Sequence, residues 1–151
     1  MYQDKRKEQA DKMNYFDCHV DTLTEILKPG DTLDENSCDL DLKRVGNFVE
    51  NYKQIFAIWK DTVKLDKEEP DRDFFRLYDR AMAYLAEENR KIALCLTGEE
   101  MEKAHRQRKA AAFLSIEDLS IMGKYIEKIR EMGFRFAMLT WNYENEYACG
   151  A

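Results

Sequence analysis

The stretch Ile92–Ile116, IALCLTGEEMEKAHRQRKAAAFLSI, decides the fold class. It opens with a short apolar run over residues 92–97, continues through a charged segment over residues 99–108, and ends in a second apolar run over residues 110–116. Short apolar runs are typical of buried strands, and the charged segment between them is long enough for a helix. A strand, a helix and another strand in this order form a βαβ unit with parallel strands.

The same alternation extends to both sides of this unit. Further strands are expected over residues 14–20, 52–59 and 134–140, further helices over residues 70–85 and 121–129, and a polar loop over residues 31–41. Residues 1–13 are expected to form a polar N-terminal extension, and residues 14–151 one domain. The predicted class is α/β with a parallel sheet.

Charge and composition exclude several classes of function. The net charge of −6 argues against nucleic acid as the main partner, because neutralising phosphates requires a basic surface. No apolar run approaches the length of a membrane span, and the charged first residues contain no secretory signal. The four cysteines lack C-x-x-C spacing and are expected to be free thiols. We therefore expect a cytoplasmic protein with no nucleic-acid or membrane partner.

Ionisable residues gather at the end of the first expected strand. The segment Tyr15–Leu27, YFDCHVDTLTEIL, places His19 between Asp17 and Asp21. Residues two apart in a strand point to the same side, so these three side chains should face together, while Cys18 faces away and packs. A histidine nitrogen beside a carboxylate oxygen forms half of a metal site. The carboxyl ends of parallel strands are also where α/β folds place their active sites.

Glu117 directly follows the apolar run 110–116, at the end of a strand that should be central. Two interpretations of this position have equal weight. Glu117 contributes to the same site as His19, or it joins Asp118 in favouring the dipole of the helix that follows. The second histidine, His105, lies in the helix of the βαβ unit and is expected to be a surface residue.

Four segments, taken in order, resemble the membrane dipeptidase family, the zinc-dependent renal-type dipeptidases and their bacterial relatives. FDCHVDTL (residues 16–23) resembles the family's opening D-x-H-x-D, and DLDLKRVGNFVENYKQIFAIW (residues 39–59) resembles its second-strand region. AAFLSIED (residues 111–118) resembles the segment with a metal-bridging glutamate. FRFAMLTWNYENEYACG (residues 134–150) resembles the strand that runs into the loop after the family's LT-x-N. The resemblance covers residues 14–150.

The resemblance implies a (β/α)₈ TIM barrel, of which this chain would carry about the first five strands. It makes His19 and Asp21 ligands of one Zn²⁺ ion and Glu117 a catalytic residue that bridges two zinc ions. A metal-activated water at this binuclear site would hydrolyse a dipeptide. Trp141 stands where the eukaryotic enzymes have a substrate-contacting histidine, and Asp118-Leu119 where many relatives have Gly-Gly.

The remaining ligands of the family, two histidines, and a later catalytic aspartate would lie beyond Ala151. We therefore expect the chain alone to be inactive and to bind at most one Zn²⁺ ion, weakly. It would act as a homo-oligomer or with a complementing C-terminal half, because a half-barrel leaves unpaired strand edges. Two alternatives stay open: a non-catalytic remnant that acts through self-association or partner binding, and a small flavodoxin-like binding domain. The latter would lack the usual Gly-rich phosphate loop.

Overall fold

The computed structural model describes residues 13–26, 31–61 and 72–150. The expected N-terminal extension lies outside these residues, except for Met13, which already belongs to the first strand. Residues 70 and 71, where the expected helix over residues 70–85 begins, also lie outside them.

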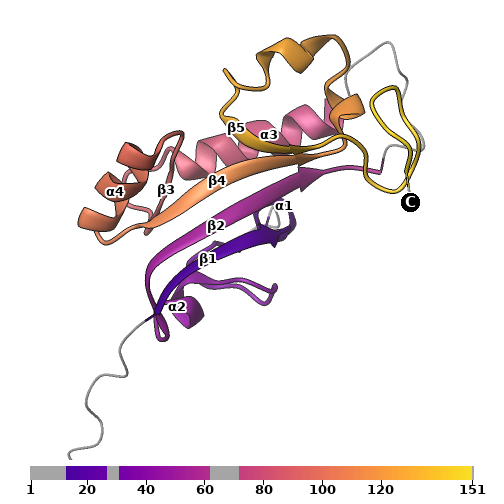
Figure 1. The fold of residues 1–151 in the computed structure, drawn as a ribbon. Coiled ribbons are helices and arrows are strands. Elements are labelled where there is room, and N and C mark those ends of the chain that lie inside the picture. Colours follow the sequence, from indigo (N-terminus) through magenta and orange to yellow (C-terminus); the bar gives the residue numbers. More distant parts are fainter. Residues whose placement is uncertain (1–12, 27–30, 62–71, 151) are drawn as a thin grey trace, which may run out of the picture.

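The described residues form one parallel sheet with helices in its connections (Figure 1). The strands are β1 (Met13–Val20), β2 (Val49–Trp59), β3 (Ile92–Leu94), β4 (Ala110–Glu117) and β5 (Phe134–Met138). The helices are α1 (Thr22–Glu25), α2 (Leu42–Val45), α3 (Arg72–Leu85), α4 (Gly98–Arg106) and the 3₁₀ helix η2 (Leu119–Lys128). All four strand pairings are parallel, which confirms the predicted α/β class.

β4 is the central strand. Its ladder with β2 is unbroken from Lys53 opposite Ala111 to Trp59 opposite Glu117. On the other edge of β4, β3 pairs with the beginning of the strand and β5 with its end, so the sheet order is β1-β2-β4-β3 with β5 beside β4. Glu117 therefore has Trp59 as its neighbour on one side and Met138 on the other.

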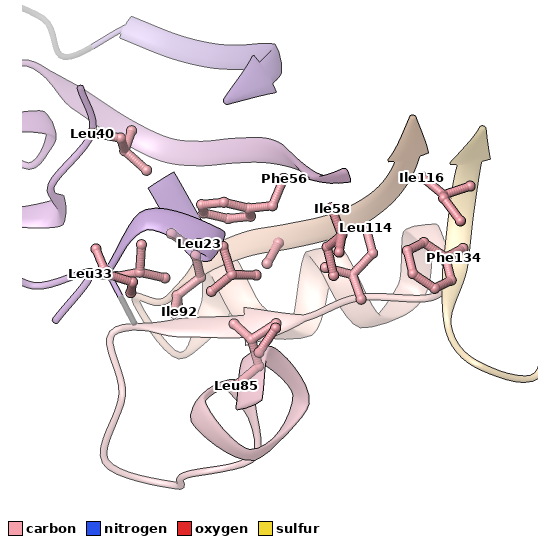
Figure 2. Close-up of a cluster of buried hydrophobic side chains, with 14 of the residues drawn as sticks. Leu23, Leu33, Leu40, Phe56, Ile58, Leu85, Ile92, Leu114, Ile116 and Phe134 are labelled. Atoms are coloured by element: carbon pink, nitrogen blue, oxygen red, sulfur yellow. The ribbon is translucent and has the colours of Figure 1, made fainter. Parts of the chain in front are cut away.

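The alternation of β4 divides its side chains between two faces of the sheet. Leu114 and Ile116 point into the main core, where they join Phe56 of β2 (Figure 2). Phe74 of α3 belongs to the same core. The opposite face carries Phe113, Ser115 and Glu117 on alternate positions of β4. α3 covers the core face, because its buried residues Phe74, Ala81 and Leu85 recur at helical spacing.

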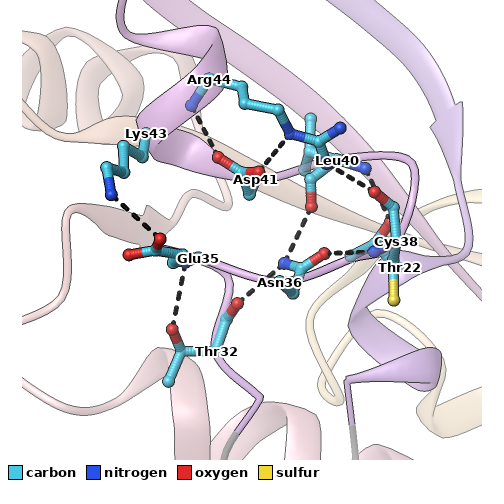
Figure 3. A network of polar contacts seen from close by, with 9 residues as sticks. All are labelled: Thr22, Thr32, Glu35, Asn36, Cys38, Leu40, Asp41, Lys43 and Arg44. Atoms are coloured by element: carbon cyan, nitrogen blue, oxygen red, sulfur yellow. Dashed lines mark hydrogen bonds and ion pairs between the residues drawn. The ribbon is translucent and has the colours of Figure 1, made fainter.

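The polar loop before α2 is held by side-chain hydrogen bonds (Figure 3). The amide nitrogen of Asn36 donates to the carbonyl oxygens of Thr32 (2.8 Å) and Leu40 (3.0 Å). Leu40 N in turn donates to the hydroxyl of Thr22 (3.3 Å), a fully buried residue at the start of α1. The loop is thereby tied to α1 and to Asp21, which directly precedes that helix.

Several expected elements differ from the observed ones: β2 begins at Val49 instead of residue 52, and α4 covers Gly98–Arg106 instead of residues 99–108. The strand expected over residues 92–97 ends at Leu94, because Leu96 N donates to the Glu100 carboxylate (2.6 Å) and the Thr97 side chain caps α4. The strand expected over residues 134–140 ends at Met138. The helix expected over residues 121–129 lies in η2, whose 3₁₀ turns are interrupted at Gly123 (φ 47°, ψ −130°).

Cys18 is exposed, so the prediction that it packs as a small core residue is wrong. It lies on β1, at the edge of the described sheet.

Among the helices described, none combines the length and the hydropathy that crossing a membrane requires.

We expect Leu114→Ala to lower the free energy of unfolding by about 2–5 kcal/mol, because it leaves a cavity beneath the central strand. Leu139→Ala is the matched control. This leucine is 55% exposed, and its loss should change the free energy of unfolding by no more than about 0.5 kcal/mol. Urea unfolding of both variants measures the difference. Equal losses would show that Leu114 does not belong to a packed core.

Candidate metal centre

His19 and Glu117 meet at the carboxyl end of the sheet, although their strands are not neighbours. β2 lies between β1 and β4, so the two backbones are separated by about two strand spacings, or 9–10 Å. Their side chains nevertheless meet across β2, and His19 Nδ1 lies 3.3 Å from Glu117 Oε1. The other ring nitrogen, Nε2, lies 3.7 Å from Asp21 Oδ1.

Asp21 reaches this cluster by a different route from the one its spacing predicts. β1 ends at Val20, and Asp21 is the residue before α1, with helical dihedral angles (φ −92°, ψ −6°). Strand alternation therefore does not place it; the turn into α1 does. Asp17 does not join the cluster, because its carboxylate turns back and accepts a hydrogen bond from His19 N (3.0 Å). The expectation that all three side chains gather holds for His19 and Asp21 alone.

The geometry of the cluster fits a metal ion. One ligand atom from each of His19, Asp21 and Glu117 can be chosen so that all three lie within 4.8 Å of one another. Two donor atoms held at about 2.1 Å by one tetrahedral ion are about 3.4 Å apart, close to the 3.3 Å between His19 Nδ1 and Glu117 Oε1. No other such group of three occurs in the described segments of the chain.

Asp21 Oδ1 provides a second, independent sign of fit. This oxygen is shielded from solvent and has no hydrogen-bond donor among the described residues. A buried carboxylate oxygen without a partner costs free energy, and a bound cation would supply the partner. His19 Nε2, at 3.7 Å, is too far away to act as its donor.

The electrostatics of Glu117 agree with this interpretation. Its side chain is 9% exposed, and burial raises the pKa of its carboxyl group. The nearby charge of Asp21 raises this pKa further, while His19 lowers it, and the net shift is upward. The charged carboxylate is thus poorly stabilised by the chain itself. A cation at this position would reverse that balance.

The two interpretations of the Glu117-Asp118 pair apply to different residues. Glu117 points toward His19, as the metal-site interpretation requires. Asp118 is the N-cap of η2 and accepts a hydrogen bond from Ser120 N (2.9 Å), as the helix interpretation requires. Sequence reasoning could not separate these roles, because both residues are acidic and adjacent.

Trp141 packs on a second tryptophan, Trp59, which the sequence did not indicate as part of the site. Its ring packs on that of Trp59, with centroids 4.9 Å apart and planes tilted by 32°. Trp59 lies directly opposite Glu117 in the β2–β4 ladder, so its side chain leaves the same face of the sheet. The two rings form an aromatic wall next to the carboxylate. The sequence predicted for Trp59 merely that it is the last residue of an apolar strand.

His105 is not the surface residue that its charged helix predicts. It is partly buried in α4, and its Nε2 atom is shielded from solvent without a hydrogen-bond partner among the described residues. Burial and the nearby charge of Lys53 lower its pKa. His105 is not part of the metal cluster. It lies near the amino-terminal ends of the strands, where it helps to line a cavity of about 420 Å³ together with residues such as Tyr52 and Ala110.

A model of the membrane dipeptidase family, peptidase family M19, matches residues 3–151. The chain belongs to the membrane dipeptidase family. A comparison with curated proteins found no match. Among solved structures, the M19 metallopeptidase dipeptidase AC is similar with a TM-score of 0.68 and 15% identity, over 87% of this chain and 44% of that one.

A second solved structure is that of a metallopeptidase from Rhodobacter sphaeroides, liganded with a phosphinate mimic of the dipeptide L-Ala-D-Ala. Its TM-score is 0.63 with 17% identity, over 89% of this chain and 47% of that one. This M19 family member therefore spans less than half the length of either protein. The predicted fold class, an α/β partial barrel, is confirmed by the parallel sheet and by these neighbours.

The raised pKa of Glu117 predicts a pH-dependent stability of the metal-free chain. Because the native state binds this proton more tightly than the unfolded chain does, ionisation of Glu117 lowers the free energy of unfolding as the pH rises from its ordinary pKa through the raised one. Glu117→Gln removes this ionisation. The variant should be more stable than the wild type at a pH of about 8, and the difference should vanish at a pH of about 3.

Urea unfolding in the presence of a chelator, repeated across this pH range, measures the effect. Glu127→Gln, a change at an exposed glutamate of η2, is the control and should alter stability little at any pH. A Glu117→Gln variant that is less stable than the wild type at high pH would mean that the carboxylate has sufficient partners within the chain.

Proposed function

We propose that the chain supplies one half of a zinc-dependent dipeptidase site, with His19 and Asp21 as ligands of one Zn²⁺ ion and Glu117 as the residue that bridges to a second ion. The observation that carries this proposal is the meeting of the three side chains, with His19 Nδ1 at 3.3 Å from Glu117 Oε1. The membership in a family of metallopeptidases supports the same assignment.

The donor set favours zinc over the hard divalent cations. An imidazole nitrogen and two carboxylate groups are common zinc ligands, and catalytic zinc sites have three protein ligands and an open position. Mg²⁺ and Ca²⁺ prefer ligand sets made of oxygen atoms, into which His19 does not fit. Three ligands suffice for one ion and not for a tightly bound pair. We therefore propose that the chain alone binds one Zn²⁺ ion weakly.

The proposed reaction is the hydrolysis of a dipeptide. When bound, zinc ions in such a site lower the pKa of a water and stabilise the charge that develops on the peptide carbonyl oxygen. His19 and Asp21 hold their place at the turn from β1 to α1, and Glu117 brings a carboxylate with two oxygens from the central strand. The wall of Trp59 and Trp141 excludes water and offers an apolar contact to a substrate side chain.

Hydrolysis by the 151 residues alone is not part of this proposal. A binuclear site needs more ligands than the three that converge here. We propose that they come from a complementing second half, and that the chain alone has no dipeptidase activity. We further propose a cytoplasmic location without a nucleic-acid or membrane partner, which the free thiols and the net charge of −6 support.

Zn²⁺ affinity separates this proposal from chance proximity. The chain has two histidines, which provide a matched pair of variants. We expect His19→Gln to weaken Zn²⁺ binding by more than about tenfold. Replacing a residue that merely hydrogen-bonds to a metal ligand already lowers metal affinity by about tenfold or more. His105→Gln should leave the affinity unchanged. Isothermal calorimetry on both variants and the wild type measures this, and equal affinity in the wild type and His19→Gln would refute the site.

The alternative, a non-catalytic remnant that associates through its open edges, has an observation of its own. On the face of the sheet opposite the main core, the rings of Phe16, Phe113 and Phe136 form a row, with centroid distances of 5.8 and 6.2 Å. Phe16 and Phe136 are more than 40% exposed. Within the described residues, β1 and β5 each pair along one edge alone.

Both functional hypotheses lead to the same expectation for assembly. Unpaired backbone groups at two sheet edges, together with exposed aromatic rings between them, favour burial in a second copy of the chain. We expect a homodimer or larger species in light scattering at micromolar concentration. A monodisperse particle near the chain mass of 17.9 kDa, with a cooperative thermal transition, would contradict the open-edge argument.

A further inference from the structure

The turn from β4 to η2 contains a buried aspartate in a backbone conformation that favours glycine. Asp118 has φ 79° and ψ 101°, and its residue surface is completely buried. A side chain at positive φ is strained, so it persists where its contacts outweigh the strain. The contacts of this carboxylate therefore indicate what Asp118 does.

The carboxylate receives hydrogen bonds from two different parts of the chain. Within its own turn, Oδ1 accepts from Ser120 N (2.9 Å) and Ser120 Oγ (2.5 Å). From the loop after β5, Asn145 Nδ2 donates to the same oxygen (2.7 Å), and Trp141 N donates to Oδ2 over a longer distance (3.4 Å). The bond from Asn145 is short and charge-assisted, which makes it the stronger of the two long-range links.

Asn145 is also the centre of the loop that carries Trp141. Its Nδ2 atom donates to the Leu139 carbonyl oxygen (2.7 Å), and its Oδ1 atom accepts from Tyr147 N (2.8 Å) and Ala148 N (3.0 Å). These bonds hold residues 139–148 in one conformation. Asp118 attaches the centre of that conformation to the end of the central strand, one residue after Glu117.

We propose that Asp118 is a positioning residue, whose carboxylate holds the loop of residues 139–148 so that Trp141 stays packed on Trp59 beside Glu117. That this wall borders a metal centre rests on the proposed function; the coupling of Asp118 to the wall does not. Asp118 thus has a role beyond capping η2, because capping requires no bond other than the one from Ser120 N.

The chain has two tryptophans in all, and both belong to this wall. Two indole rings 4.9 Å apart couple their ultraviolet transitions and give an exciton couplet in the circular dichroism spectrum, so this signal reports on the wall. Trp141→Phe should abolish the couplet, which assigns it. An absent couplet in the wild-type chain would overturn the proposal at once.

Three variants test the coupling. Asp118→Gly removes the carboxylate but suits the positive φ, so the chain should still fold cooperatively. Asn145→Ala removes the loop side of the link. Both should reduce the couplet by at least about half. Ser120→Ala, which removes a bond within the turn alone, should retain it.

A full couplet in Asp118→Gly and Asn145→Ala would overturn the proposal, as would an equal loss in Ser120→Ala, which would show that Asp118 acts through its turn alone. A Zn²⁺ titration of the wild-type chain, run in parallel, separates this inference from the proposed function. A wild-type chain that binds no Zn²⁺ would refute the metal centre, whereas the couplet results would still decide whether Asp118 positions Trp141.

Discussion

The parallel ladder between β2 and β4 is the constraint on which the rest of the structure depends. Seven consecutive residue pairs, from Lys53–Ala111 to Trp59–Glu117, fix the register without a bulge. A shift by one residue would turn Glu117 toward the helices and place Ile116 in the site. The ladder thus decides at once which residues form the core, which carboxylate faces His19, and which ring stands beside it.

Unfavourable local features concentrate at the end of this ladder. Among the described residues, burial outweighs the partners of the Glu117 carboxylate, Asp21 Oδ1 lacks a donor, and Asp118 has a strained backbone. Each lowers the stability of the metal-free chain. Proteins retain such features where function requires them, and two of the three would be relieved by a bound cation. This clustering at one end of the sheet supports a functional site there more strongly than any single distance.

The sequence predicted those features that local patterns determine. Apolar runs located β2 and β4, helical spacing located α3, and the position after an apolar run located Glu117. His19 followed from its place at the end of the first strand. Asp21 was named on the basis of strand alternation but is placed by the turn into α1, so the residue was identified with an incorrect physical reason.

Contacts between distant segments could not be predicted in this way. The pairing of β2 with β4, past β3, depends on sheet topology and not on any local pattern. The same is true of the Trp59–Trp141 wall and of the Asp118–Asn145 bond, whose partners are 82 and 27 residues apart. β3 is shorter than its apolar run because capping of α4 competes for the same residues.

Crystallography of the chain grown with Zn²⁺, using anomalous scattering at the zinc edge, tests the central claim most directly. We expect an anomalous peak at the carboxyl end of the sheet, with donor atoms of His19, Asp21 and Glu117 each at about 2.0–2.2 Å from it. Zinc bound at His105 or at the exposed cysteines, with these three side chains left without metal, would contradict it.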